Sequence, residues 1–184
     1  MDTRTDEEIV EGVKQGDKEL FGVLVERYEG KMLRYARRFL FDEDESRDLA
    51  QNVFVKAYMN IRGFDEKKRF SPWIYRIAHN EFVNGLKKKS RDPVRFFDPD
   101  LIFPHPVAEG SLEEDMDRNV MRGILDRNFK ALELKYREPL SLHYFEEMEY
   151  RQIAEVLRIP VSTVGVRILR GKKLLKKMLE QNHG

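Results

Sequence analysis

Residues 150–175 read YRQIAEVLRIPVSTVGVRILRGKKLL, and this stretch decides the fold of the C-terminal half of the chain. Its apolar residues recur at helical spacing and predict a short helix over 150–157. A tight turn at 158–161 follows, and either Ser162 or Thr163 is expected to cap a second helix. Two helices joined by a tight turn form a helix-turn-helix.

The second of these helices is strongly basic. Seven Lys or Arg residues and no acidic residue lie between Arg158 and Lys177. A recognition helix enters the major groove with its N-terminal residues at base edges, while its later cations meet phosphates. The competing interpretation is an ordinary helical hairpin with a solvated basic face. The cap, the turn and the charge together favour duplex DNA binding.

Residues 92–110 predict a linker between two domains. They hold four of the seven prolines and end at Gly110, a composition typical of a semi-extended tether. The predicted organisation is therefore a first domain over 1–91, an acidic Pro-rich linker over 92–110 and a second domain over 111–184. Within the second domain, a capping box at Ser111 opens one helix, and another is expected over 137–145.

The first domain is also expected to be helical. Thr5 and Glu8 form a capping box, and Asp17 is expected to cap a second helix that ends at Gly30, with a third segment over 32–40. Asp42 then caps a long helix with an unbroken apolar stripe. The inward residues of that helix are Leu49, Val53, Ala57 and Ile61. No stretch alternates as a strand, so the predicted fold class is all-α, with two small helical domains joined by a flexible linker.

A second basic helix is predicted from Ser71 to about Lys89. Ser71 is expected as the N-cap and Pro72 at the first helical position, where the missing N–H costs nothing. One face of this helix combines a large aromatic, two amides and two cations. Its members are Trp73, Arg76, Asn80, Asn84 and Lys87.

The aromatic residues near the start of this helix suggest contact with separated strands. Tyr75 is expected in the core, whereas Phe64 and Trp73 are expected at the surface, with Phe70 nearby. Exposed aromatic faces stack unpaired bases, and cations follow the nucleic-acid backbone. The competing interpretation places all of these aromatics in the core of a small bundle.

The composition excludes several classes of function. There is no cysteine, which excludes disulfides and thiolate sites. The four histidines lack ligand spacing, so neither a catalytic residue nor a metal ligand nor a cofactor is predicted. No run of about 20 apolar residues predicts a membrane span, and the acidic start does not resemble a signal peptide. A cytoplasmic location is expected.

Three motifs in order closely resemble bacterial RNA polymerase sigma factors of the extracytoplasmic-function (ECF) group, in the sigma-70 family. They are DLAQNVFVKAYMNI, FDEKKRFSPWIYRIAHNEFVNGLKKKSR, and the helix-turn-helix quoted above. The resemblance covers nearly the whole chain and comprises the family's regions two and four without region three. It implies a protein that binds core RNA polymerase and promoter DNA and that an anti-sigma factor holds inactive.

The resemblance also implies three sets of site residues. Core polymerase, through the clamp helices of its largest subunit, would meet Asp48, Gln51 and Asn52. The melted minus-ten element would meet Phe64, Phe70, Trp73, Arg76, Asn80, Asn84 and Lys87, with Phe64 and Asn80 framing a pocket for a flipped base. The minus-thirty-five duplex would meet Ser162, Thr163, Val164, Gly165, Arg167, Arg170 and Lys173.

The chain departs from the family pattern at four positions. Asn52 stands where an acid is usual, and Gly165 and Val166 replace a usual cation and a polar residue. Arg158 replaces the usual Gly or Asn in the turn. Two other functions stay open from the residues alone. One is a conventional helix-turn-helix regulator acting without polymerase, and the other, which no cluster of residues supports, is an enzyme.

Overall fold

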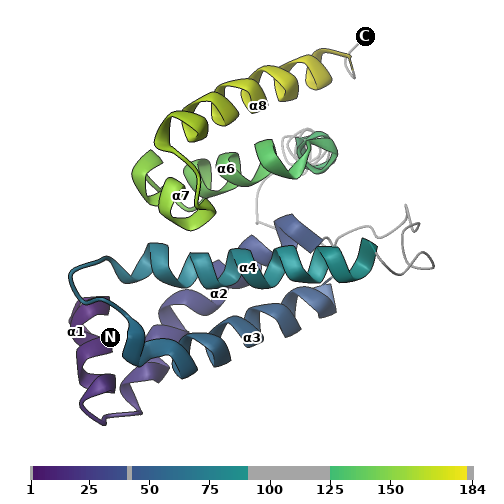
Figure 1. Ribbon diagram of the computed structural model, residues 1–184. Helices are drawn as coiled ribbons and strands as arrows, with labels where there is room; N and C mark the ends of the chain where they lie inside the picture. Colours follow the sequence, from purple (N-terminus) through teal and green to yellow (C-terminus); the bar gives the residue numbers. More distant parts are fainter. Residues whose placement is uncertain (1, 41–42, 91–124, 182–184) are drawn as a thin grey trace, which may run out of the picture. The chain divides into compact units, whose positions relative to one another are not determined.

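The computed structural model describes residues 2–40, 43–90 and 125–181, and every regular element in them is a helix. The all-α prediction is therefore confirmed for this part of the chain. Two compact units make up the fold, the first centred on the helices between residues 6 and 90 and the second on those at 134–144 and 161–181 (Figure 1). The predicted linker and the domain boundaries beside it lie outside the described residues and stay predictions.

The first two helices differ in how well the sequence predicts them. Helix α1 (Asp6–Lys14) begins with the predicted capping box, in which Thr5 Oγ1 accepts a hydrogen bond from the Glu8 N–H at 3.2 Å. Helix α2 (Leu20–Leu40) begins three residues after Asp17 and runs through Gly30 without a break. The predicted break was wrong because a glycine costs a helix only about 1 kcal/mol. The buried face of α2 continues on both sides of Gly30, with Leu24 and Tyr28 before it and Met32 after it.

The next helices carry the surfaces that the sequence singled out. Helix α3 (Glu43–Asn60) starts where predicted, although Asp42 lies outside the described residues. A short 3-10 turn, η1 (Ile61–Gly63), follows, and helix α4 (Phe70–Ser90) begins one residue before Ser71. Ser71 is therefore not the N-cap. Pro72 still lies in the first turn, where its missing N–H has no intrahelical acceptor to lose.

An aromatic cluster joins α2 to α4 in the core of the first unit. Tyr35 is fully buried, and its ring meets those of Phe39, Tyr75 and Phe82 with centroids 4.9 to 5.4 Å apart. Each such aromatic pair adds about 0.5–1.5 kcal/mol beyond the area that it buries. Helices α2, α3 and α4 contact one another pairwise, so this cluster fixes α4 against the bundle. Tyr75 is in the core, as predicted.

The second unit depends on a close contact between two helices. Helix α6 (Leu134–Tyr144) begins three residues earlier than predicted, which places Pro139 inside it. It packs against α8 (Val161–Gln181) at Gly171, where an added Cβ would lie 2.8 Å from Leu140 Cδ1 and 3.2 Å from Tyr136 Cβ. The absence of a side chain at Gly171 lets the two helices approach this closely.

Helix α7 (Tyr150–Leu157) has the predicted bounds, and the turn after it has a defined geometry. Arg158 adopts a left-handed conformation with φ 53°, and the Ile159 N–H donates to the Ala154 carbonyl at 3.2 Å. This is the 6→1 hydrogen bond of a Schellman motif, which usually places glycine where Arg158 stands. Helix α8 then begins at Val161, so the predicted caps Ser162 and Thr163 already lie inside its first turn.

Candidate nucleic-acid interface

The polar face predicted on α4 is present in the first unit. Because α4 is one continuous helix, residues spaced three and four apart along it lie on one face. Trp73 and Arg76 are half-buried, whereas Asn80, Asn84 and Lys87 are exposed. The structure therefore brings an indole, a guanidinium and two amides into one row. Amides of this kind read the hydrogen-bonding edges of unpaired bases, and the cations meet phosphates.

The aromatic residues beside this row are placed differently from the prediction. Phe64 and Phe70 are 3% and 0% exposed, and their ring centroids lie 5.3 and 5.5 Å from that of Trp73. The expectation that Phe64 lies at the surface was wrong, because its ring fills the space beneath Trp73. Phe64 and Phe70 are buried and pack against the Trp73 ring, so they do not present stacking faces of their own in this structure.

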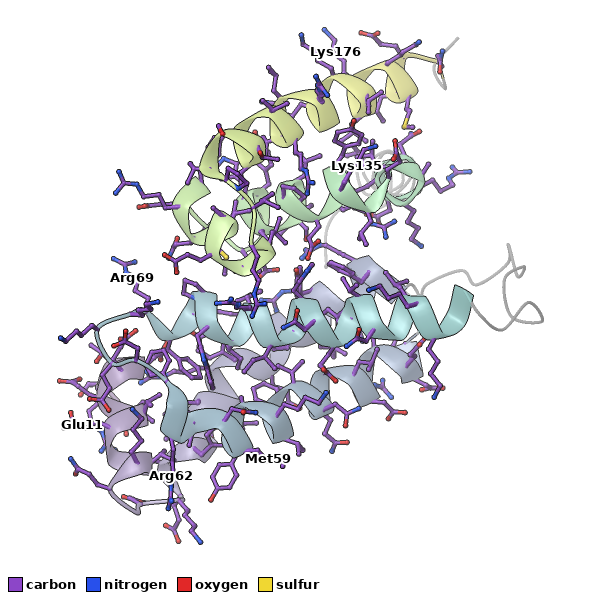
Figure 2. All side chains as sticks on the ribbon, viewed as in Figure 1. Glu11, Met59, Arg62, Arg69, Lys135 and Lys176 are labelled. Atoms are coloured by element: carbon purple, nitrogen blue, oxygen red, sulfur yellow. The ribbon has the colours of Figure 1, made fainter. Side chains whose placement is uncertain are left out.

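The residues that connect η1 to α4 present charge next to this row. Asp65, Glu66, Lys67, Lys68 and Arg69 are all exposed. Asp65 organises their turn, since its carbonyl accepts from the Lys68 N–H at 2.9 Å and its carboxylate accepts from the Lys67 N–H at 3.1 Å. Arg69 projects away from the bundle at the start of α4 (Figure 2). Three cations therefore stand next to the α4 row.

Helix α3 exposes the three residues that the resemblance assigned to core polymerase. Asp48, Gln51 and Asn52 are exposed on the side of α3 that does not pack in the bundle. Sequence reasoning missed two apolar residues on the same side, Val55 and Met59, which are 54% and 75% exposed. Their spacing was the available signal, since each lies two residues after a buried position of the predicted stripe. Two residues turn a helix by about 200°, and Met59 points outward accordingly (Figure 2).

The seven predicted contact residues of α8 differ in exposure. Ser162, Arg170 and Lys173 are exposed, and Thr163, Gly165 and Arg167 are half-buried. Val164, which was also assigned to the duplex, is fully buried like Ile168, so its side chain is not available to the duplex in this structure. Only one acid, Glu180, accompanies the six cations of α8, and it lies 3.7 Å from Lys176 at the far end.

Two apolar side chains on the outer face of α8 were not predicted as contact residues. Val166 and Leu169 are 47% and 57% exposed. With Ser162 and Lys173 they form a row spaced four, three and four residues apart, which places all four on one side of the helix. Gly165 lies next to this row, and a Cβ there would meet Tyr150 at an ordinary 3.6 Å. Packing therefore does not require glycine at this position.

No group of three or more His, Asp or Glu side chains in this part of the chain could hold a metal ion. None of the described helices combines the length and the apolar character needed to cross a membrane.

Comparisons with known proteins match two separate stretches of the chain. Residues 24–92 match the family model for sigma-70 region 2, and residues 122–175 match the model for sigma-70 region 4. The ECF RNA polymerase sigma factor SigW of Bacillus subtilis is 34% identical over 178 residues, which cover 92% of this chain and 94% of that protein. The RNA polymerase sigma-H factor of Pseudomonas aeruginosa is 34% identical over 95% of this chain and 94% of its own length.

Solved structures show the same fold. The structure of CnrH in complex with the cytosolic domain of CnrY has a TM-score of 0.72 at 24% identity and covers 97% of this chain and 99% of that one. The sigma factor RpoE of Bartonella quintana, in complex with the anti-sigma factor NepR, has a TM-score of 0.71 at 20% identity. That match covers 87% of this chain and 96% of that one.

Proposed function

The chain belongs to the sigma-70 family of RNA polymerase sigma factors, in its ECF group, and from this premise we propose how its surfaces direct promoter-specific initiation. It binds core RNA polymerase through the outer side of α3, captures unpaired minus-ten bases on α4 and reads the minus-thirty-five duplex with α8. One observation carries the proposal: the amides, the indole and the cations on α4 differ in kind from the six cations on α8. The first suits separated strands and the second suits a duplex.

On α4, Asn80 is the residue proposed to read a flipped base. It is exposed in the middle of the row, four residues from both Arg76 and Asn84, so bases and phosphates can be held on either side of it. Trp73, supported from below by Phe64 and Phe70, provides the aromatic surface. An aromatic side chain that stacks an unpaired base contributes about 1–3 kcal/mol.

On α8, Ser162, Arg167, Arg170 and Lys173 are proposed to approach the upstream duplex. Val166 and Leu169 add an apolar element to this surface, since both are exposed on the side of α8 that carries Ser162 and Lys173. Apolar side chains in the major groove contact the C5-methyl group of thymine. We expect the upstream element to contain thymine opposite Val166. Replacing that thymine with uracil, which lacks only the methyl group, should weaken binding about fourfold in the wild type and have little effect in Val166→Ser.

On α3, core polymerase is the proposed partner of Asp48, Gln51 and Asn52, and Val55 and Met59 extend the same surface. Asn52 stands where the family has an acid, so Asn52→Asp should increase the affinity for core polymerase. Fluorescence anisotropy with a labelled chain measures this affinity without DNA. An unchanged or lower affinity would contradict the assignment of this residue.

The proposed partners also include an anti-sigma factor, because CnrH and RpoE, which share this fold, are each seen in complex with another protein. The proposed location is the cytoplasm, where core polymerase and the chromosome are found. No chemical step is assigned to the chain itself, since its part is to bind the polymerase and the promoter.

Transcription from a random promoter library by core polymerase with the chain tests the whole proposal. Asn80→Ala should lose duplex opening, and Arg167→Ala should lose upstream selectivity. Lys88→Ala is the matched control for α4, because Lys88 is exposed one residue beyond the row. Tight operator binding without core polymerase would instead support a conventional helix-turn-helix regulator. If Asn80→Ala left both opening and sequence preference unchanged, the minus-ten assignment would be wrong.

A further inference from the structure

Helix α1 holds both ends of the segment between η1 and α4, here named the 64–70 segment. At the first end, Lys14 Nζ donates to the Phe64 carbonyl at 2.7 Å and to the Glu66 carboxylate at 2.6 Å. At the other end, Glu7 Oε1 accepts a hydrogen bond from the Phe70 N–H at 2.8 Å. These partners are 50 to 63 residues apart in the sequence, so the contacts are tertiary and specific to the folded first unit.

The hydrogen bonds from Lys14 to the Phe64 carbonyl and from the Phe70 N–H to Glu7 are both charge-assisted. Each involves a charged side chain and a backbone group, and such hydrogen bonds are shorter and stronger than neutral ones. The side chain of Lys14 is only 19% exposed, and its ammonium also lies 5.9 Å from the centroid of the Phe64 ring. The Phe70 N–H is one of the first donors of α4, which have no partner within the helix, and a carboxylate suits the positive end of the helix dipole.

Helix α1 is itself firmly held, so it can act as a fixed support. Ile9 and Val10 are fully buried, and the capping box closes its N-terminus. Asp6 accepts hydrogen bonds from Arg27 at 2.7 Å and from the Tyr28 hydroxyl at 2.5 Å. The Tyr28 ring in turn meets the Phe70 ring edge-on, with centroids 5.5 Å apart.

Between the two anchored ends, the segment is exposed, with the Glu66 carboxylate held by Lys14. All five residues from Asp65 to Arg69 are exposed, and three of them are cations next to the α4 row. The anchored ends carry Phe64 and Phe70, which support Trp73. The anchors on α1 thus fix the position of both the cations and the aromatic surface.

We propose that α1 is a positioning element for strand capture, in which Lys14 and Glu7 hold the 64–70 segment in the conformation that receives unpaired minus-ten bases. The helix lies outside residues 24–92, which match the sigma-70 region 2 model, so that match assigns it no role. The inference rests on the proposed function of the α4 row and adds residues from a different element. Lys14 and Glu7 act through the segment and do not themselves touch DNA.

Lys14→Met tests the inference, since it keeps the length of the side chain and removes the donor. The holoenzyme is titrated with a fluorescent single-stranded non-template oligonucleotide that spans the minus-ten region of a promoter selected by the wild type. It is titrated separately with the upstream duplex of the same promoter. Losing a charge-assisted hydrogen bond should weaken single-strand binding about tenfold or more and leave the duplex affinity unchanged. Lys14→Arg should restore most of the loss.

Controls distinguish positioning from a general loss of structure. Lys18→Met removes an exposed lysine just after α1 and should change neither affinity. Glu7→Leu should repeat the selective loss from the other anchor, and Glu7→Gln, which keeps an acceptor, should lose less. Equal weakening of both affinities in Lys14→Met, or no change in either, would overturn the inference. If the wild-type holoenzyme itself failed to bind the single strand, the proposed function of α4 would fail instead.

Discussion

The contact of α6 with α8 at Gly171 allows a prediction whose magnitude follows from the structure. Gly171→Ala adds a Cβ that would lie 2.8 Å from Leu140 Cδ1 and 3.2 Å from Tyr136 Cβ. Leu140 is only 3% exposed, so its methyl group can move only within the interior of the unit. The Cβ of Tyr136 is fixed to the backbone of α6, so relieving that contact requires the two helices to separate.

Gly165→Ala is the matched control, because it makes the same change in the same helix. At Gly165 the nearest atom to an added Cβ is 3.6 Å away, which is an ordinary contact. Both substitutions gain about 0.8–1 kcal/mol of helix propensity. Only Gly171→Ala also overpacks the contact between α6 and α8, which costs about 1–3 kcal/mol. The two variants should therefore differ in the free energy of unfolding by about 1–3 kcal/mol, with Gly171→Ala the less stable.

Hydrogen–deuterium exchange measures this difference where it arises. The chain has two units, so a single unfolding transition of the whole protein is not assured, and exchange reports the opening of each helix separately. Amides of α6 and α8 should exchange faster in Gly171→Ala than in Gly165→Ala, while those of α2 should exchange alike in both. Equal or slower exchange in Gly171→Ala would refute the view that α6 and α8 touch through this glycine.

Three other substitutions have outcomes that follow from local geometry. Arg158→Gly should slow amide exchange in α7 by the equivalent of about 0.5–1 kcal/mol, because glycine adopts the left-handed conformation without strain; faster exchange would exclude strain at this turn. Thr5→Ala should speed amide exchange in α1 by removing a cap that contributes about 1 kcal/mol, and unchanged exchange would contradict the capping box. Burial, reinforced by the hydrogen bond to Asp6, raises the pKa of Tyr28 well above its usual value near 10. The folded state therefore holds this proton more tightly than the unfolded state, so the stabilisation is complete below about pH 10 and declines as the pH rises further. Denaturation across this range should show the decline in the wild type and a smaller one in Tyr28→Phe.

The sequence predicted the elements whose signals are local. The bounds of α7 follow from a short apolar pattern closed by a turn, and the cap of α1 follows from two residues three apart. Tertiary contacts decided the other cases. Gly30 failed to end α2 because buried side chains continue on both sides of it, and α4 begins at Phe70 because Glu7, far away in the sequence, accepts its N–H.

The sequence predicted which helix faces carry the candidate surfaces, but it did not predict which of their apolar side chains are buried. Periodicity placed Asn80, Asn84 and Lys87 on one exposed face correctly, since the helix that carries them is continuous. Residue type alone cannot tell whether an aromatic ring forms a surface or supports one, and for this reason Phe64 was misplaced. Val164 shows the converse, because a position within a family motif does not decide which way its side chain faces.

The anchoring of the 64–70 segment by α1 also bears on how the protein is made. Lys14 is synthesised early, but its partner carbonyl on Phe64 comes 50 residues later, and Phe70 comes 63 residues after Glu7. At about 5–20 residues per second, synthesis of the residues from Glu7 to Phe70 takes roughly 3–12 seconds. The residues of α1 are thus synthesised before the segment that they hold. The contacts that hold the 64–70 segment therefore cannot form until Phe70 has been synthesised.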